Sequence, residues 1–225
     1  TKQSSTASSP SPQRQEEEPD VCCICLDELP TDIDKLIRFI CCGKRCCLGC
    51  QHDVKKSKMP DDLKNRCHQC RKPNPTTNEE SLERLREWVE KNTAWAQSMM
   101  ASWYRDGKCG LKQSYVMAAM LFEKAVAQGD PEAMYNLACL YRDGQGVVQS
   151  DEKTVELYTM AAEWENVKAM SNLGVLYFQG QGVVQSFELA HEWLSKAANE
   201  GHETAINNLK ILDKNEGKST TTTAP

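Results

Sequence analysis

The feature of this sequence that most constrains its fold is a dense cluster of cysteines in the first third of the chain. The chain has 12 cysteines among 225 residues, and ten of them lie between Cys22 and Cys70. Eight of the ten form closely spaced pairs: Cys22 with Cys25, Cys41 with Cys42, Cys47 with Cys50, and Cys67 with Cys70. The N-terminus has no apolar signal-peptide core, so we expect a reducing compartment and metal ligands rather than disulfides.

Cysteine pairs separated by two residues are typical zinc ligands. Two such thiolates wrap a turn around one tetrahedral Zn²⁺, with each sulfur at about 2.3 Å. Three pairs of this kind and one adjacent pair supply eight ligands, which is enough for two four-sulfur sites. A segment of about 50 residues buries too little apolar surface to fold alone, whereas structural zinc contributes roughly 10–16 kcal/mol of apparent binding free energy. The sequence therefore predicts two structural zinc ions.

The spacing of these ligands resembles the RING finger, in particular its subclass with eight cysteines and no histidine ligand. The resemblance covers most of the segment from Val21 to Pro73, and we place the RING-type zinc finger and its linker at residues 21–75. RING modules interleave their two sites. The resemblance implies one zinc at Cys22, Cys25, Cys47 and Cys50, and the other at Cys41, Cys42, Cys67 and Cys70.

The second pair departs from the usual RING pattern, because Cys41 and Cys42 are adjacent. Adjacent side chains on an extended chain point in opposite directions, so the backbone must bulge or turn at this pair. Cys46 or His52 is an alternative ligand in place of one of the two.

RING ubiquitin ligases perform no covalent chemistry on the module itself. The module binds a ubiquitin-conjugating enzyme and holds its ubiquitin thioester in a reactive orientation. In the family, an apolar residue inside the first pair docks the conjugating enzyme, and here this residue is Ile24, with Leu26 nearby. A cation directly after the last ligand bridges the enzyme and ubiquitin, and here it is Arg71. The resemblance thus implies a ubiquitin ligase without a catalytic residue of its own.

Other functions were weighed against this one. In a non-enzymatic adaptor, the zinc module is a rigid connector and the rest of the chain gathers protein partners. Nucleic-acid binding is disfavoured by the net charge of −5, and Lys55, Lys56 and Lys58 have no aromatic platform beside them on which bases would stack. A thiol oxidoreductase is disfavoured because its paired cysteines would not form two interleaved groups of four.

From Ala96 onward the sequence repeats itself. Matching residues recur at a step of 36 residues, as in Ala133, Ala169 and Ala205, in Leu137, Leu173 and Leu209, and in Gly144 and Gly180. The tetrapeptide 147–150 recurs unchanged as 183–186. Each unit reads as a helix, a glycine-containing turn and a second helix. A period in the mid-thirties with two helices per unit predicts an α-solenoid.

The pattern Ala-x-x-x-Leu-Gly/Ala-x-x-Tyr-x-x-Gly-x-Gly-Val, followed by Ala-Ala, resembles Sel-1-like repeats, which are relatives of tetratricopeptide repeats. We place three such repeats and a capping helix at residues 93–214 and expect the solenoid to bind protein. Glu165 replaces the glycine seen as Gly129 and Gly201, so we expect the turn between the second and third units to differ.

The remaining segments are assigned from composition. Residues 1–20 and 215–225 are expected to be disordered, because they contain few apolar residues. Residues 76–92 are expected to form a connecting helix, which begins at a capping box of Thr77 and Glu80. No apolar run reaches the roughly 18–20 residues of a membrane span, so a cytoplasmic or nuclear location is expected. The predicted fold is a small zinc-stabilised α+β RING-type module followed by an all-α solenoid of helix-pair repeats.

Overall fold

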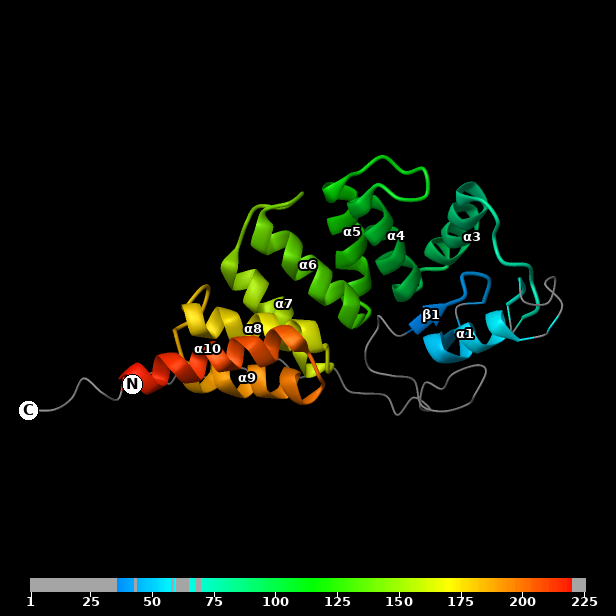
Figure 1. Ribbon diagram of the computed structural model, residues 1–225. Coiled ribbons are helices and arrows are strands. Elements are labelled where there is room, and N and C mark those ends of the chain that lie inside the picture. Colours follow the sequence, from blue (N-terminus) through cyan, green and yellow to red (C-terminus); the bar gives the residue numbers. More distant parts are fainter. Residues whose placement is uncertain (1–35, 43, 58, 60–64, 68–69, 220–225) are drawn as a thin grey trace, which may run out of the picture.

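The structure is a computed structural model that describes residues 36–42, 44–57, 59, 65–67 and 70–219. A short hairpin and one helix are followed by helices that stack in chain order along a curved path (Figure 1). The elements are β1 (Leu36–Arg38), β2 (Arg45–Cys47), α1 (Leu48–Lys56), α3 (Asn78–Glu90), α4 (Ala94–Asp106), α5 (Tyr115–Val126), α6 (Pro131–Asp143), α7 (Asp151–Glu163), α8 (Val167–Gln179), α9 (Phe187–Asn199) and α10 (Glu203–Ser219).

The predicted helix pairs are α4 with α5, α6 with α7, and α8 with α9, and their ends follow from local chemistry. The first helix of each pair ends at a glycine with a left-handed backbone, at Gly107, Gly144 and Gly180, where φ is 66°, 64° and 69°. The second helix begins at Ser114, Ser150 or Ser186, whose side chain accepts a hydrogen bond from the backbone N–H three residues later. Each turn therefore stops one helix and starts the next.

A second glycine in the same turn fixes how neighbouring repeats meet. Gly146 has φ of 73°, and a Cβ atom placed on it would lie 2.4 Å from the carbonyl carbon of Tyr115. Gly182 repeats the arrangement, with 2.6 Å to the carbonyl oxygen of Asp151. These turns pack directly on the first residue of the second helix of the preceding repeat. Only a residue without a side chain fits this approach.

The turn between the second and third repeats does not differ from the others, contrary to the expectation from Glu165. Glu165 adopts φ of 62°, close to the 82° of Gly129 and the 78° of Gly201. Its backbone N–H still donates to the carbonyl of Ala162 at 3.0 Å, as Gly129 donates to its own helix. The surrounding helices therefore impose the left-handed conformation even on a residue with a Cβ atom.

The helices at either end of the array differ in how closely they follow the sequence prediction. At the N-terminal end, α3 begins as expected, since Thr77 accepts a hydrogen bond from the N–H of Glu80 at 3.1 Å. The Glu80 carboxylate in turn accepts from the N–H of Thr76, one residue earlier than in the usual capping box. At the other end, α10 continues to Ser219, so residues 215–219 are helical where a disordered tail was expected.

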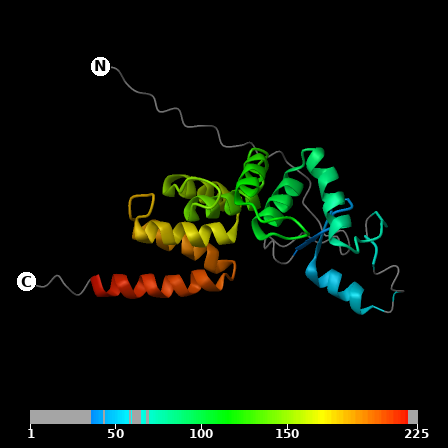
Figure 2. The same ribbon diagram turned by 90° about the horizontal axis from the view of Figure 1, so that it is seen from above.

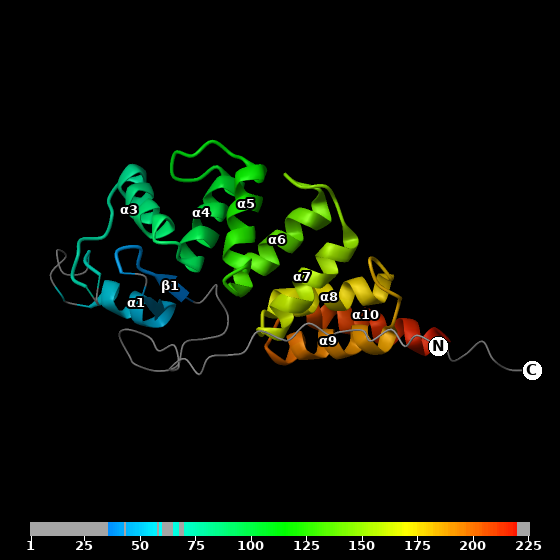
Figure 3. The ribbon, with the colours of Figure 1, turned by 180° about the vertical axis from the view of Figure 1, so that it is seen from behind.

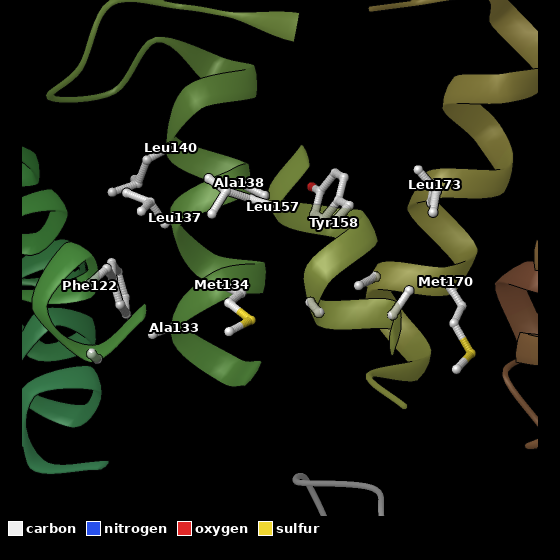
Figure 4. Packing of buried hydrophobic residues seen from close by; sticks show 14 of the residues in the cluster. Phe122, Ala133, Met134, Leu137, Ala138, Leu140, Leu157, Tyr158, Met170 and Leu173 are labelled. Atoms are coloured by element: carbon white, nitrogen blue, oxygen red, sulfur yellow. The ribbon is translucent and has the colours of Figure 1, made fainter. Parts of the chain in front are cut away.

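The apolar core is continuous along the repeats. Its buried side chains run from Leu85 on α3 to Leu212 on α10, and Figure 4 shows the central part around Phe122, Leu137 and Leu173. Because each helix pair buries its apolar face only against its neighbours, the stack has no separate centre. Among the described residues, no helix combines the length and the apolar character that crossing a bilayer requires.

The hairpin and α1 lie at the N-terminal end of this stack. β1 runs beside α3 and α4, and the views from the front, from above and from behind agree on this (Figures 1, 2 and 3). Ile40, in the turn after β1, is packed against the core of the repeats. The cysteine-bearing module is thus in contact with the solenoid.

The glycine turns give a stability prediction. Gly146→Ala should lower the free energy of unfolding by about 2–4 kcal/mol, because it combines a left-handed alanine with an overpacked contact to the Tyr115 backbone. Gly201→Ala is the matched control: φ is also positive, but an added Cβ meets no atom within 4 Å. It should cost about 1 kcal/mol. Urea unfolding of both variants measures the difference, and equal losses would mean that this contact does not limit stacking.

Candidate metal centre and repeat face

The first two cysteines of the candidate centre lie in the turn between β1 and β2. The strands pair antiparallel, with Leu36 opposite Cys47 and Arg38 opposite Arg45. The pairing continues where the N–H of Phe39 donates to the carbonyl of Lys44 at 2.9 Å. The N–H of Cys42 donates back to the carbonyl of Phe39 at 3.2 Å, which closes a tight turn. Cys41 and Cys42 therefore lie on bent backbone, which removes the objection that adjacent side chains diverge.

The other two cysteines lie in a second tight turn, far along the chain. Arg66 and Pro73 form an isolated antiparallel bridge, and the N–H of Cys67 donates to the carbonyl of Lys72 at 2.8 Å. Within this frame the N–H of Cys70 approaches the Cys67 sulfur at 3.5 Å. This contact brings the backbone of Cys70 against the first sulfur of the turn. The turn therefore presents both sulfurs on one side.

The four sulfur atoms from these two turns come together. The Sγ atoms of Cys41, Cys42, Cys67 and Cys70 all lie within 4.8 Å of one another. Cys42 is 3.4 Å from Cys67, and Cys70 is 3.3 Å from Cys41. Sulfurs that surround a tetrahedral zinc at about 2.3 Å are about 3.8 Å apart, so a small expansion accommodates the ion. These four residues are the set that the RING resemblance assigns to one zinc.

The protonation of these thiols depends on their crowding. Burial raises the pKa of the Cys42 thiol to about 11, and burial together with hydrogen bonding of the Cys41 thiol to Cys70 and Cys67 raises the pKa of Cys41 further. Burial also raises the pKa of the Cys70 thiol. Hydrogen bonds with the Lys72 backbone and the neighbouring thiols lower it by more, so the pKa of Cys70 is below its ordinary value. Four adjacent thiolates repel one another, and a divalent cation is the group that offsets this repulsion. The donor set is all sulfur, which suits zinc.

The remaining predicted ligands are only partly described. Cys47 ends β2 and Cys50 lies in the first turn of α1, so they are about one helical turn apart. Cys22 and Cys25 lie outside the described residues, as do Ile24 and Leu26 of the expected docking site. The second zinc site therefore stays a prediction.

The alternative ligands do not join the group of four. Cys46 is fully buried, and its sulfur faces the side-chain oxygen of Gln51 at 3.9 Å. It packs with Phe39 and Cys67 in the small core of the module. His52 is exposed on α1. Among the described cysteines and histidines, the group around Cys67 thus needs neither of them.

Arg71 is exposed and directly follows the last of the four cysteines. Its backbone is left-handed, with φ of 61°, and its N–H donates to the carbonyl of Cys67 at 2.9 Å. Its carbonyl accepts a hydrogen bond from the Arg66 guanidinium at 3.3 Å. A left-handed position favours glycine, so an arginine here has a cost in stability. The side chain itself stays available to solvent.

A polar cluster centred on Tyr158 links three helices of the repeats. The hydroxyl of Tyr158, on α7, accepts hydrogen bonds from Asn172 on α8 at 3.1 Å and from Arg142 on α6 at 3.3 Å. It also contacts the sulfur of Cys139 at 3.2 Å. Because a phenol has one proton to give and two acceptor positions, these partners satisfy it fully. Burial raises the pKa of Tyr158, so the hydroxyl stays neutral.

The repeat itself contains the signal that identifies this cluster. The positions equivalent to Tyr158 in the first and third repeats hold Phe122 and Leu194. An apolar side chain suffices for stacking there, so the hydroxyl of Tyr158 adds a specific link between α6, α7 and α8. Between the first two repeats the link is different: the Arg105 guanidinium donates to the side-chain oxygen of Asn136 at 2.6 Å.

Two kinds of comparison place the repeats among known proteins. The family model described as Sel1 repeat matches residues 96–130, 131–163 and 167–202. The chain is similar to the solved structure of c5321, a protective antigen present in uropathogenic Escherichia coli strains, which displays an SLR fold. The two sequences are 28% identical and the TM-score is 0.60. The match covers 63% of this chain and 30% of c5321. The chain is also similar to a Sel1 repeat protein from Oxalobacter formigenes, with 26% identity, a TM-score of 0.56, and coverage of 59% of this chain and 54% of that one. No curated protein matches the chain.

These matches confirm the repeats. Residues 96–202 contain three Sel1 repeats, and the predicted helical solenoid is correct. The family match includes no residue before 96, so it does not bear on the cysteine module. The chain spans less than two thirds of the length of either solved relative.

The hydrogen bonds of Tyr158 lead to a prediction about the stability of the repeats. Tyr158→Phe should lower the free energy of unfolding by about 1–2 kcal/mol, because Arg142 and Asn172 lose an acceptor in a partly buried place. Tyr141→Phe is the matched control, since the hydroxyl of Tyr141 accepts only from the exposed Lys153 ammonium, at 3.3 Å. It should change stability by less than about 0.5 kcal/mol. Thermal and urea unfolding compare the two, and an equally small effect of both would show that the cluster contributes little.

Proposed function

We propose that this protein is a zinc-dependent RING-type ubiquitin ligase whose Sel1 repeats hold a protein partner. The zinc module docks a ubiquitin-conjugating enzyme and orients its ubiquitin thioester. The repeats recruit the substrate or a regulatory partner. No residue of the chain forms a covalent intermediate, so the rate enhancement comes from orientation.

The observation that carries the proposal is which pairs of cysteines meet. Cys41 and Cys42 lie with Cys67 and Cys70, so the second pair joins the fourth. Two zinc sites arranged one after the other along the chain would instead bring Cys67 and Cys70 to Cys47 and Cys50. Cys50 is described and is not part of the group of four. The interleaved arrangement that supports a RING module is therefore favoured over a sequential pair of zinc ribbons.

Zinc would be held at this centre by the four thiolates, and it would join the hairpin turn to the turn at Cys67. This keeps the loop that ends at Arg71 at a fixed distance from α1. The Arg71 guanidinium offers several donors from a backbone that its neighbours hold in place. Such a donor set fits a bridge between two proteins. Its strained backbone is consistent with a side chain that is retained for function.

The second candidate is a non-enzymatic adaptor, in which the same zinc centre is a rigid connector. The Sel1 repeats favour it, since a protein-interaction scaffold needs no ligase activity. The two functions share the metal and the repeats. They differ in whether Ile24 and Arg71 act on a conjugating enzyme.

Discharge of ubiquitin from a charged conjugating enzyme onto free lysine separates the two candidates. Arg71→Ala should slow single-turnover discharge about tenfold or more, because a hydrogen bond to a charged group contributes about 1.5–3 kcal/mol, and should leave binding of the enzyme nearly unchanged. Ile24→Ala should weaken binding roughly fivefold or more through lost apolar contact. Both variants should keep their zinc, because neither residue is a ligand.

Lys44→Ala is the matched control for Arg71→Ala. Lys44 is an exposed cation in the same module, beside the cysteine turn, and its loss should leave discharge unchanged. Failure of the zinc-loaded wild-type protein to accelerate discharge with a panel of conjugating enzymes would reject the ligase and leave the adaptor. Equal slowing by Lys44→Ala and Arg71→Ala would mean that net charge, rather than a specific bridge, is responsible.

A further inference from the structure

The turn that carries two of the candidate ligands also touches the repeats. Ile40 directly precedes Cys41, and its side chain is packed against the apolar core that continues through the solenoid. The hairpin lies beside α3 and α4 in all three views of the chain (Figures 1, 2 and 3). A shift of the Cys41 backbone would therefore move Ile40 relative to the first repeats.

A charge pair acts across the same boundary. Arg45, the first residue of β2, is partly buried, and the Asp130 carboxylate acts on its guanidinium electrostatically. Asp130 belongs to the repeats, where its side chain caps α6 by accepting a hydrogen bond from the N–H of Ala133 at 2.8 Å. Opposite charges on the two units favour the docked arrangement.

The linker is held as well. Arg66 bridges to Pro73, and the Arg84 guanidinium on α3 donates to the Pro73 carbonyl. The segment between Cys70 and α3 is thus tied to the zinc module on one side and to the helical array on the other. The candidate metal centre therefore has one turn that contacts the repeats and another that continues into a fixed linker.

We propose that metal binding at Cys41, Cys42, Cys67 and Cys70 is coupled to the docking of the hairpin on the Sel1 repeats, so that the metal-loaded module and the solenoid form one rigid body. The inference rests on the zinc centre of the proposed function. In the loaded state a partner on the repeats would have a fixed position relative to a protein bound at the module. Without the metal, the turn at Cys41 is free to rearrange and Ile40 to leave its contact.

Coupling of this kind is reciprocal: if the metal favours docking, then docking favours the metal by the same factor. A change on the repeats, 60 residues or more from any candidate ligand in the sequence, should therefore alter the affinity for zinc. Asp130 is such a position, since the nearest candidate ligand in the sequence is Cys70.

Asp130→Asn tests the inference with little disturbance of the fold. In the next repeat Asn166 stands at the equivalent cap and accepts from the N–H of Ala169 at 2.9 Å, so asparagine caps this helix position. The variant removes the negative charge that acts on Arg45 and keeps the cap. Zinc affinity, measured by competition with a chromophoric chelator in the full chain, should fall about fivefold, the effect of one ion pair of moderate strength. Asn166→Asp, which adds a carboxylate at the matching cap of the next repeat, should leave it unchanged.

Ile40→Ala supplies an independent variant, because it removes the apolar contact and leaves every ligand in place. It should also lower zinc affinity, and chelation should increase the distance between fluorescent labels on α1 and α6 in the wild-type chain. Unchanged affinity in both Asp130→Asn and Ile40→Ala would overturn the coupling while leaving the zinc centre intact. A wild-type chain that binds no zinc would overturn the coupling together with the proposed function.

Discussion

The N-terminal module depends on bringing sulfur atoms from distant turns to one point. Cys42 and Cys67 are separated by 25 residues, and Cys41 and Cys70 by 29. Among the described residues of the module, the buried apolar cluster has Phe39, Cys46 and Cys67 at its centre. So small a core does not offset the entropy of closing these loops. We propose that a bound metal supplies the missing free energy and thereby fixes the positions of the hairpin, α1 and the Arg71 loop.

The repeats are held together in a different way. Their core is continuous from α3 to α10, and each pair of helices stacks on the next through this core. The close approach at Gly146 and Gly182 sets the spacing of successive repeats, and the Tyr158 cluster adds a polar link at one junction. The two halves of the chain are therefore stabilised in different ways. The apolar contact of Ile40 and the electrostatic interaction of Arg45 with Asp130 connect them.

The sequence was most informative where the structure is local or periodic. The step of 36 residues predicted the helix pairs, and the serine caps and glycine turns occur where the pattern places them. The turn at Cys41 and Cys42 was required by the geometry of adjacent side chains and is present. Left-handed Glu165 was not foreseen, because residue preference alone cannot show that packing of the flanking helices overrides it.

Contacts between distant segments carried no such signal. The local sequence around Arg45 or Asp130 does not indicate that the two residues interact, since 85 positions separate them. Tyr158 was detectable only as a departure from the apolar Phe122 and Leu194 at the equivalent positions, and its partners come from two other helices, α6 and α8. The continuation of α10 to Ser219 was likewise not predictable, because this polar sequence is also compatible with a disordered tail.

The most direct test of this account is to identify the ligands themselves. Cadmium replaces zinc in sulfur sites, and NMR of the cadmium-substituted protein detects coupling between each ion and the β-protons of its cysteines. Two cadmium signals are expected, one coupled to Cys41, Cys42, Cys67 and Cys70, and the other to Cys22, Cys25, Cys47 and Cys50. A signal that couples Cys67 and Cys70 to Cys47 and Cys50, or one that includes Cys46, would contradict it.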